Sequence, residues 1–304
     1  MSAPGPAVPR PAWQGTALAG LGVACFSGTL PATAFAMRGL DPYLVAVGRG
    51  TVAGIVAAVC LVAAGARPFP PRSELGSYIV IALGIVFGFP LLSTLALHAG
   101  AAVSHAAVVV GLLPAATAVC AVLRAGERPR ALFWVAGAGG TATVTAFTLS
   151  RGAEGLAGAD LLLAGALVCA AVGYTEGGRL ARRTPGWQVI SYALVVALPV
   201  AVPVTIVLAA TTPVRPAGDA MAGFAYLALV SAFVGFIPWY AGLARGGIAR
   251  AGQTQLLQPL LGLLWAWLFL GEELQPATIA TALAVLVCVA ATQRSRGQTP
   301  RGTE

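Results

Sequence analysis

The side chains best suited to recognise a solute stand in a segment that is otherwise apolar. Gln255 and Gln258 are three residues apart, so they share one face of a helix, with Gly262 one turn further along. An amide in hydrocarbon needs a hydrogen-bond partner, so this face lines either a cavity or a contact with another helix. We favour the cavity, whose neutral amides would bind a small polar solute without changing it chemically.

A single arginine, Arg49, stands inside another apolar segment, about seven residues from its start and therefore about 10 Å below the membrane surface. A charged arginine costs about 2.5 kcal/mol or more at the centre of a bilayer, so its guanidinium must face protein or water and have a partner. One interpretation is structural, with the guanidinium bonded to helix-end carbonyls or to Asp41. The other is a binding site for an anionic or zwitterionic substrate.

Glu176 is the only carboxylate that we expect well inside an apolar segment, and Tyr174 lies close to it. The glutamate precedes Arg179 by three residues, and such a pair stabilises a helix by about 0.2 to 0.5 kcal/mol. The alternative is a protonatable coupling site or a ligand for a cationic group, with Tyr174 beside it in the same cavity. The sequence leaves both interpretations open.

Aromatic and histidine side chains gather near the ends of apolar segments. Trp239 and Tyr240 close an aromatic run, which is typical of a belt at the membrane interface and is also compatible with the wall of a cavity. His98 and His105 flank the turn after the third apolar segment. They either hydrogen-bond to nearby backbone or respond to pH.

Motifs for catalysis and for cofactor binding are absent from the sequence. There is no HExxH, no paired intramembrane aspartate, no glycine-rich phosphate loop and no serine beside an orienting histidine. The five cysteines lie inside apolar runs without metal-ligand spacing. We therefore expect no enzyme activity, no cofactor and no metal, and an ATP-driven pump is excluded within this chain.

The composition indicates that the apolar segments containing the candidate residues lie in lipid. Of the 304 residues, 58% are hydrophobic and 9% charged, and the mean hydropathy is +0.85. A soluble domain is about 25% charged, so this chain could not cover a water-exposed surface. The net charge of +8 does not indicate a nucleic-acid partner, because the basic residues stand singly or in pairs between apolar runs.

Ten apolar segments follow a proline-rich tail, and most reach the roughly 20 residues that a transmembrane helix needs. Their expected limits are Thr16–Met37, Pro42–Ala64, Leu75–Leu97, Ala102–Leu123, Leu132–Leu149, Ala159–Leu180, Trp187–Ala210, Ala220–Leu243, Ala251–Leu270 and Ala277–Thr292. They must be helices, because lipid offers no partner to an unpaired backbone amide. The first also contains Ala34-Phe35-Ala36, which resembles a signal-peptidase site, but its place in the repeat described below favours a retained helix.

The arginines predict the orientation of these helices. With the N-terminus in the cytoplasm and ten alternating spans, 14 of the 18 basic residues fall on the cytoplasmic side and three on the outside. Cytoplasmic loops of membrane proteins are enriched in Lys and Arg. We therefore predict a protein of the inner or plasma membrane with both termini in the cytoplasm.

The two halves of the chain repeat each other at a distance of 145 residues. Pro114 falls on Pro259, and Gly126-Glu127 falls on Gly271-Glu272, so the same Pro…Gly-Glu spacing occurs twice. A repeat of five helices inverts the second copy, and inverted repeats place a binding site near the membrane midplane between the halves. Prolines interrupt helices, which gives five candidate hinges: Pro31, Pro90, Pro114, Pro238 and Pro259.

These repeated motifs resemble the EamA-type domain of the drug/metabolite transporter superfamily. The resemblance rests on Leu95-Ala96 through Pro114 to Gly126-Glu127 and on Tyr240-Ala241 through Pro259 to Gly271-Glu272, and Arg49 in the second helix also matches. It implies ten helices, a central cavity and transport of small metabolites, often by export. The position 145 residues beyond Arg49 is Leu194, so the arginine is not repeated.

We expect an all-α integral membrane protein of ten transmembrane helices in two inverted five-helix repeats. The expected divisions are a tail over 1–15, repeats over 16–150 and 151–293, and a tail over 294–304. The expected function is secondary-active export of small polar or zwitterionic metabolites such as amino acids, by alternating access and with a coupling proton as a possible partner. A membrane-embedded or lipid-modifying enzyme and a non-transporting structural protein are the alternatives. The oligomeric state stays open.

Overall fold

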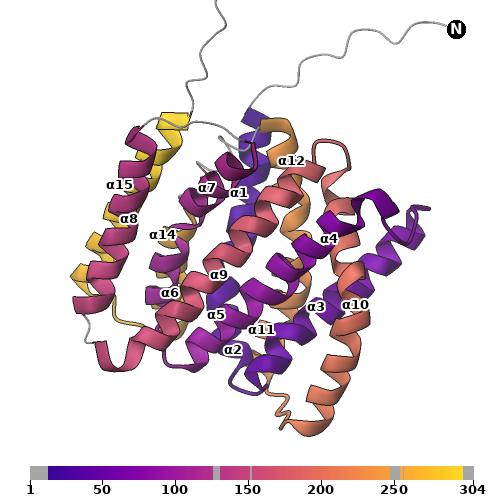
Figure 1. The fold of residues 1–304 in the computed structure, drawn as a ribbon. Coiled ribbons are helices and arrows are strands. Elements are labelled where there is room, and N and C mark those ends of the chain that lie inside the picture. The colour runs from indigo at the N-terminus through magenta and orange to yellow at the C-terminus, as the bar shows by residue number, and fades with distance from the viewer. Residues whose placement is uncertain (1–12, 126–130, 151–152, 247–253, 256, 297–304) are drawn as a thin grey trace, which may run out of the picture.

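The computed structural model describes residues 13–125, 131–150, 153–246, 254–255 and 257–296. Within these ranges every regular element is a helix and no strand occurs. The helices stand side by side in one bundle, and the first residues of α1 and the last residues of α15 lie at the same end of it (Figure 1). The all-α prediction is confirmed.

The elements of the two halves have the following bounds. The first half contains α1 (Trp13–Ser27), α2 (Thr29–Ala36), α3 (Pro42–Ala63), η1 (Arg72–Glu74), α4 (Leu75–Ile81), η2 (Ala82–Gly88), α5 (Phe89–His98), α6 (Val103–Val110), α7 (Leu113–Ala125) and α8 (Ala131–Ser150). The second contains α9 (Ala153–Leu180), α10 (Gly186–Thr211), α11 (Gly218–Ala225), η3 (Tyr226–Val234), α12 (Phe236–Gly246), α14 (Leu257–Leu270) and α15 (Pro276–Arg296).

Seven helical stretches among the described residues are long and apolar enough to cross a bilayer. They are Trp13–Ala36, Pro42–Ala63, Arg72–His98, Val103–Cys120, Gly158–Leu180, Gly186–Thr211 and Gly218–Arg245. Leu257–Leu270 and Pro276–Cys288 are apolar but shorter. The count of ten spans therefore stays a prediction.

Helices that correspond under the 145-residue shift pack against each other. The pairs are α3 with α10 and α8 with α15, while α14, which corresponds to α7, packs against α6. The remaining contacts also come in related sets, since α1 and α2 pack against α12 and α11, while α9 packs against α5, α4 and η2. Two halves related by a two-fold axis would make contacts of this kind, so the arrangement is compatible with the inverted repeat.

The middle of two helical stretches is wound as a π-helix. These turns are η2 (Ala82–Gly88) and η3 (Tyr226–Val234), and a shift of 145 residues carries 82–88 onto 227–233, inside η3. π-helical turns are rare and occur frequently at functional sites. Their recurrence at one position in both halves is a structural sign of the repeat that the residue pattern did not predict.

The five prolines expected to act as hinges all lie in the first turn of a helical segment. Pro31 is in α2, Pro90 in α5, Pro114 in α7, Pro238 in α12 and Pro259 in α14. Proline is tolerated there because the first backbone N–H groups of a helix have no acceptor within it. The regular α-helical winding therefore changes just before these prolines, at Pro90 through the π-helical turn η2 inside one continuous stretch, while the use of these points as hinges remains a proposal.

Candidate functional site

A small cavity near Arg49 receives side chains from both halves of the chain. It measures about 20 Å³, which is room for roughly one water molecule. Its lining residues are Phe26, Thr29, Arg49, Ile85 and Phe89 from the first half and Ala170, Tyr174, Ser231, Phe236 and Gln258 from the second. Three of the residues singled out in the sequence, Arg49, Tyr174 and Gln258, are thus brought together.

Hydroxyl groups are the partners of the Arg49 guanidinium. Its Nη2 donates to Ser231 Oγ at 3.2 Å, and Ser231 Oγ shares a hydrogen bond of 2.7 Å with Thr29 Oγ1. Arg49 is only 5% exposed. Asp41, the acidic partner considered from the sequence, instead accepts from the backbone N–H groups of Tyr43 and Leu44 at the start of α3.

No carboxylate among the described residues is therefore paired with Arg49. None of the ion pairs recorded among the described residues includes this arginine. A buried cation held only by neutral hydroxyls retains a strong attraction for an anionic group, since burial weakens solvent screening. Arg49 would accordingly attract an anionic group toward the cavity, which in this structure has room for only about one water molecule.

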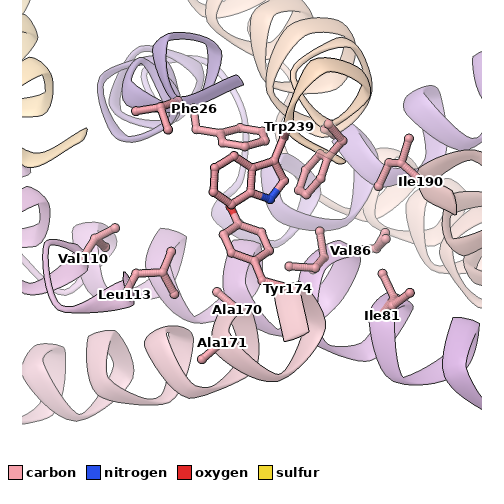
Figure 2. Close-up of a cluster of buried hydrophobic side chains, with 14 of the residues drawn as sticks. Phe26, Ile81, Val86, Val110, Leu113, Ala170, Ala171, Tyr174, Ile190 and Trp239 are labelled. Atoms are coloured by element: carbon pink, nitrogen blue, oxygen red, sulfur yellow. The ribbon is translucent and has the colours of Figure 1, made fainter. Parts of the chain in front are cut away.

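Aromatic rings form one wall of this region. Phe26 and Phe236 lie 4.7 Å apart between ring centroids, and the Trp239 indole is 5.6 Å from the Tyr174 ring. Figure 2 shows the indole between Phe26 and Tyr174. Trp239 is 2% and Tyr240 0% exposed, so these two side chains lie inside the bundle and not on its lipid-facing surface, and neither is among the residues that line the cavity.

The two glutamines occupy different surroundings. Gln258 lines the cavity, whereas Gln255 is 2% exposed and is not among the lining residues. Its amide nitrogen Nε2 is buried and has no hydrogen-bond partner among the described residues. The structure therefore places one of the pair at the cavity and the other in the helix packing beside it.

Glu176 has the ion-pair partner that its spacing predicted. Arg179 Nε donates to Glu176 Oε1 at 3.1 Å, and Arg179 Nη2 also donates to Ser77 Oγ at 2.7 Å. Glu176 is buried, but it does not line the Arg49 cavity. The pairing with Arg179 is confirmed, and a coupling role for Glu176 stays a prediction.

Comparison with known proteins agrees with a cavity shared between two repeats. The EamA-like transporter family matches residues 13–149 and again residues 157–292. The chain belongs to the EamA-like transporter family. It is a multi-pass membrane transporter of the drug/metabolite transporter superfamily, and this membership points away from an enzyme.

Two individual proteins are similar to this EamA-family chain. One is the Bacillus subtilis (strain 168) protein named "Uncharacterized transporter YdeK", 44% identical over 275 residues that cover 90% of this chain and 95% of that protein. The other is a solved crystal structure, 21% identical, with a TM-score of 0.67 over 92% of this chain and 98% of its own. The second likeness shows the fold alone.

The Gly-Glu pair that ends the ninth segment of this EamA-family protein caps a helix of the other half. Glu272 accepts hydrogen bonds of 2.9 Å from the backbone N–H groups of Val103 and Ser104, at the start of α6. A carboxylate at a helix N-terminus satisfies free N–H groups and complements the helix dipole. The corresponding Glu127 lies outside the described residues.

Sequence reasoning missed two groups of polar residues in this family member. Thr29 and Ser231 stand alone in apolar runs, and nothing in their spacing shows that they meet at Arg49. The expected sixth segment, Ala159–Leu180, agrees within one residue with the apolar stretch Gly158–Leu180, but the helix α9 begins further upstream, at Ala153. Asp160 is therefore seven residues inside that helix and contacts His105, so Glu176 is not the only carboxylate within the bundle.

Proposed function

We propose that this protein is a secondary transporter that binds a small zwitterionic metabolite, such as an amino acid, at Arg49 and moves it across the cell membrane. The observation that carries this proposal is a buried arginine, in a cavity lined by both halves, that pairs with no carboxylate in the part of the chain that the structure describes. The guanidinium would bind the solute carboxylate, and Gln258 would hydrogen-bond to its polar groups. The aromatic wall would cover its apolar part.

The size of the cavity supports alternating access. Small-molecule sites usually measure about 300 to 1,000 Å³, so a cavity of about 20 Å³ must widen before a solute can enter. The changes in helical winding before Pro31, Pro90, Pro114, Pro238 and Pro259 are where such bending costs least. In this proposal the two halves rock about the cavity and expose it to one side of the membrane at a time.

The remaining parts of the proposal follow from the sequence. They are ten spans in two inverted five-helix repeats, both termini in the cytoplasm, and residence in the inner or plasma membrane. The family resemblance favours export as the direction. Together, the spans, the orientation and the membrane would place the cavity near Arg49 within the lipid bilayer, between the cytoplasm and the outside of the cell.

Proteoliposomes loaded with a panel of amino acids test the proposal. Counterflow of radiolabelled amino acids is expected for the wild type, and Arg49→Gln should reduce it on the order of a hundredfold, because a hydrogen bond to a charged group contributes about 1.5 to 3 kcal/mol. Arg67→Gln is the matched control, since Arg67 lies exposed in the loop after α3. Equal flux in Arg49→Gln and wild type would remove Arg49 from the site, and no flux of any amino acid in the wild type would reject this substrate class.

A further inference from the structure

A second ionisable pair lies inside the bundle, away from the residues that line the Arg49 cavity. His105, the third residue of α6, is 1% exposed, and its Nε2 lies 2.6 Å from Asp160 Oδ1 on α9. The Asp160 side chain is 19% exposed. Its second oxygen Oδ2 is buried and has no hydrogen-bond partner among the described residues. Ionisable residues inside transmembrane segments are costly and commonly mark proton or ion pathways.

The other charged groups near His105 are few. Glu272 is bound to the N–H groups of the two preceding residues, which places a second carboxylate at this end of α6. Of the helices packed against α6, α2 and α14 carry no ionisable side chain, and α5 brings only His98 at its exposed end. The helix α15 brings Cys288 and, at its far end, Arg294 and Arg296.

The neighbours of α9 add little charge at Asp160. The helix α8 contains no ionisable residue. The contacts of η2 and α5 with α9 run antiparallel, from Gly84 beside Gly173 to Leu92 beside Gly165, so the last turn of α5, which ends at His98, continues toward Asp160. The recorded contacts of α7 and α12 with α9 are at Thr175 and Gly177, four or more turns beyond Asp160. The environment of His105 is therefore set mainly by two carboxylates, which attract a proton.

We propose that His105 and Asp160 form the proton-binding site of this transporter. Binding one proton converts a neutral imidazole beside a carboxylate, with a net charge of −1, into an imidazolium–carboxylate pair of net charge zero. The partial exposure of Asp160 gives protons access to the pair. Glu176 is less suited to this role because Arg179 already neutralises it.

The position of the pair explains how a proton would influence solute movement, and this step rests on the proposed transport function. The helix α6 belongs to the first half and α9 to the second, so the hydrogen bond between His105 and Asp160 joins the two halves. Before protonation only the Asp160 carboxylate is charged, whereas protonation of the imidazole adds an attraction between opposite charges to the hydrogen bond. Protonation therefore strengthens the closure of this end, and release of the proton weakens it.

Histidine NMR tests the proton site without any solute. The chain has two histidines, so His98→Gln, a change at an exposed side chain, leaves His105 as the only signal in protein labelled with nitrogen-15 histidine in phospholipid nanodiscs. We expect the ring signals to change from those of a neutral imidazole to those of an imidazolium when the pH is lowered. Asp160→Asn removes the carboxylate that contacts the ring and should therefore change the pH response of these signals. A ring that keeps one protonation state throughout, or a transition that Asp160→Asn leaves in place, would overturn the proposal.

Transport measurements test the coupling. In proteoliposomes with a pH gradient, one proton moved per solute supports an accumulation of up to about tenfold per pH unit. His105→Gln and Asp160→Asn should abolish this accumulation and retain solute exchange without a gradient, while His98→Gln should behave as the wild type. Accumulation that persists in either variant overturns the coupling. Absence of exchange in the wild type rejects the proposed substrate class instead, and the NMR titration then still decides whether the proton site exists.

Discussion

The two halves of this protein share a scaffold but not its chemistry. Both contain a π-helical turn at the same place, η2 in one and η3 in the other, and both begin a helical segment with a proline at equivalent positions, Pro114 and Pro259. The polar residues differ. Leu194 stands opposite Arg49 in the repeat, Leu113 opposite Gln258, and Arg250 opposite His105, so each of these groups occurs once.

The duplication therefore gives both halves the same helices, while the polar residues that could bind a solute or a proton occur in one half only. Leu194 is 1% exposed and meets Arg49 at a second, smaller void of about 10 Å³ between α3 and α10. Related positions thus approach each other, and one carries the charge while the other provides apolar packing. In the proposed alternating-access mechanism, a symmetric scaffold would allow two equivalent bent states, and the single Arg49 and the single His105–Asp160 pair would make those states chemically distinct.

The largest contrast is expected between Gln258 and its counterpart Leu113. Gln258→Ala should abolish amino acid counterflow without lowering the yield of folded protein in the membrane, because the amide contacts the solute. Leu113→Ala removes a side chain that is 2% exposed, which should destabilise the protein by about 2 to 5 kcal/mol and lower its yield. Flux and thermal unfolding measured on both variants check the pair, and unchanged flux in Gln258→Ala would place the glutamine outside the site.

A smaller contrast is expected at Gly84 and at Leu229, the position 145 residues beyond it. A Cβ atom at Gly84 would lie 2.5 Å from the backbone oxygen of Cys169, so Gly84→Ala should push η2 away from α9 and cost about 1 to 3 kcal/mol. Leu229 is 41% exposed, and Leu229→Ala should have little effect. Thermal unfolding in detergent measures both, and equal melting temperatures for the two variants would contradict the close packing of η2.

The smallest effect is expected where Glu272 caps α6. Glu272→Gln keeps the shape of the side chain but removes its charge, and should lower stability by about 1 kcal/mol. The neighbouring Glu273 is exposed, so Glu273→Gln serves as the control. Chemical unfolding curves measure the stability of the two variants. An equal loss of stability in Glu272→Gln and Glu273→Gln would show that the cap at Val103 and Ser104 makes no specific contribution.

Much of the fold could be predicted from the sequence because lipid imposes strict rules. Apolar runs such as Pro42–Ala64 must be helical, and the observed α3 ends within one residue of that expectation. The limits of α9 could not be predicted as well, because Gly155 to Gly158 is only weakly apolar and hides the start of the helix. The π-helical turns η2 and η3 could not be predicted for a related reason. A continuous apolar run has the same composition whether it is wound as an α-helix or as a π-helix.

The site was predictable only in part. Arg49, Tyr174 and Gln258 stand out because each is polar in an apolar segment, and the structure brings them to one cavity. Their hydroxyl partner Ser231 lies 182 residues from Arg49 in the chain, and only tertiary packing joins the two. The same holds for His105 and Asp160, whose pairing depends on the contact between α6 and α9.

Sidedness of two equivalent loops is the most direct test of the central claim that inverted halves enclose the cavity. Phe69 and Val214 are 145 residues apart, both are exposed, and each lies in the loop after its half's second long helix. In a background with the five native cysteines replaced, a membrane-impermeant maleimide should label Val214→Cys in intact cells and Phe69→Cys only after the cells are opened. Labelling of both positions from the same side would contradict the inversion, and with it a cavity at the midplane between the halves.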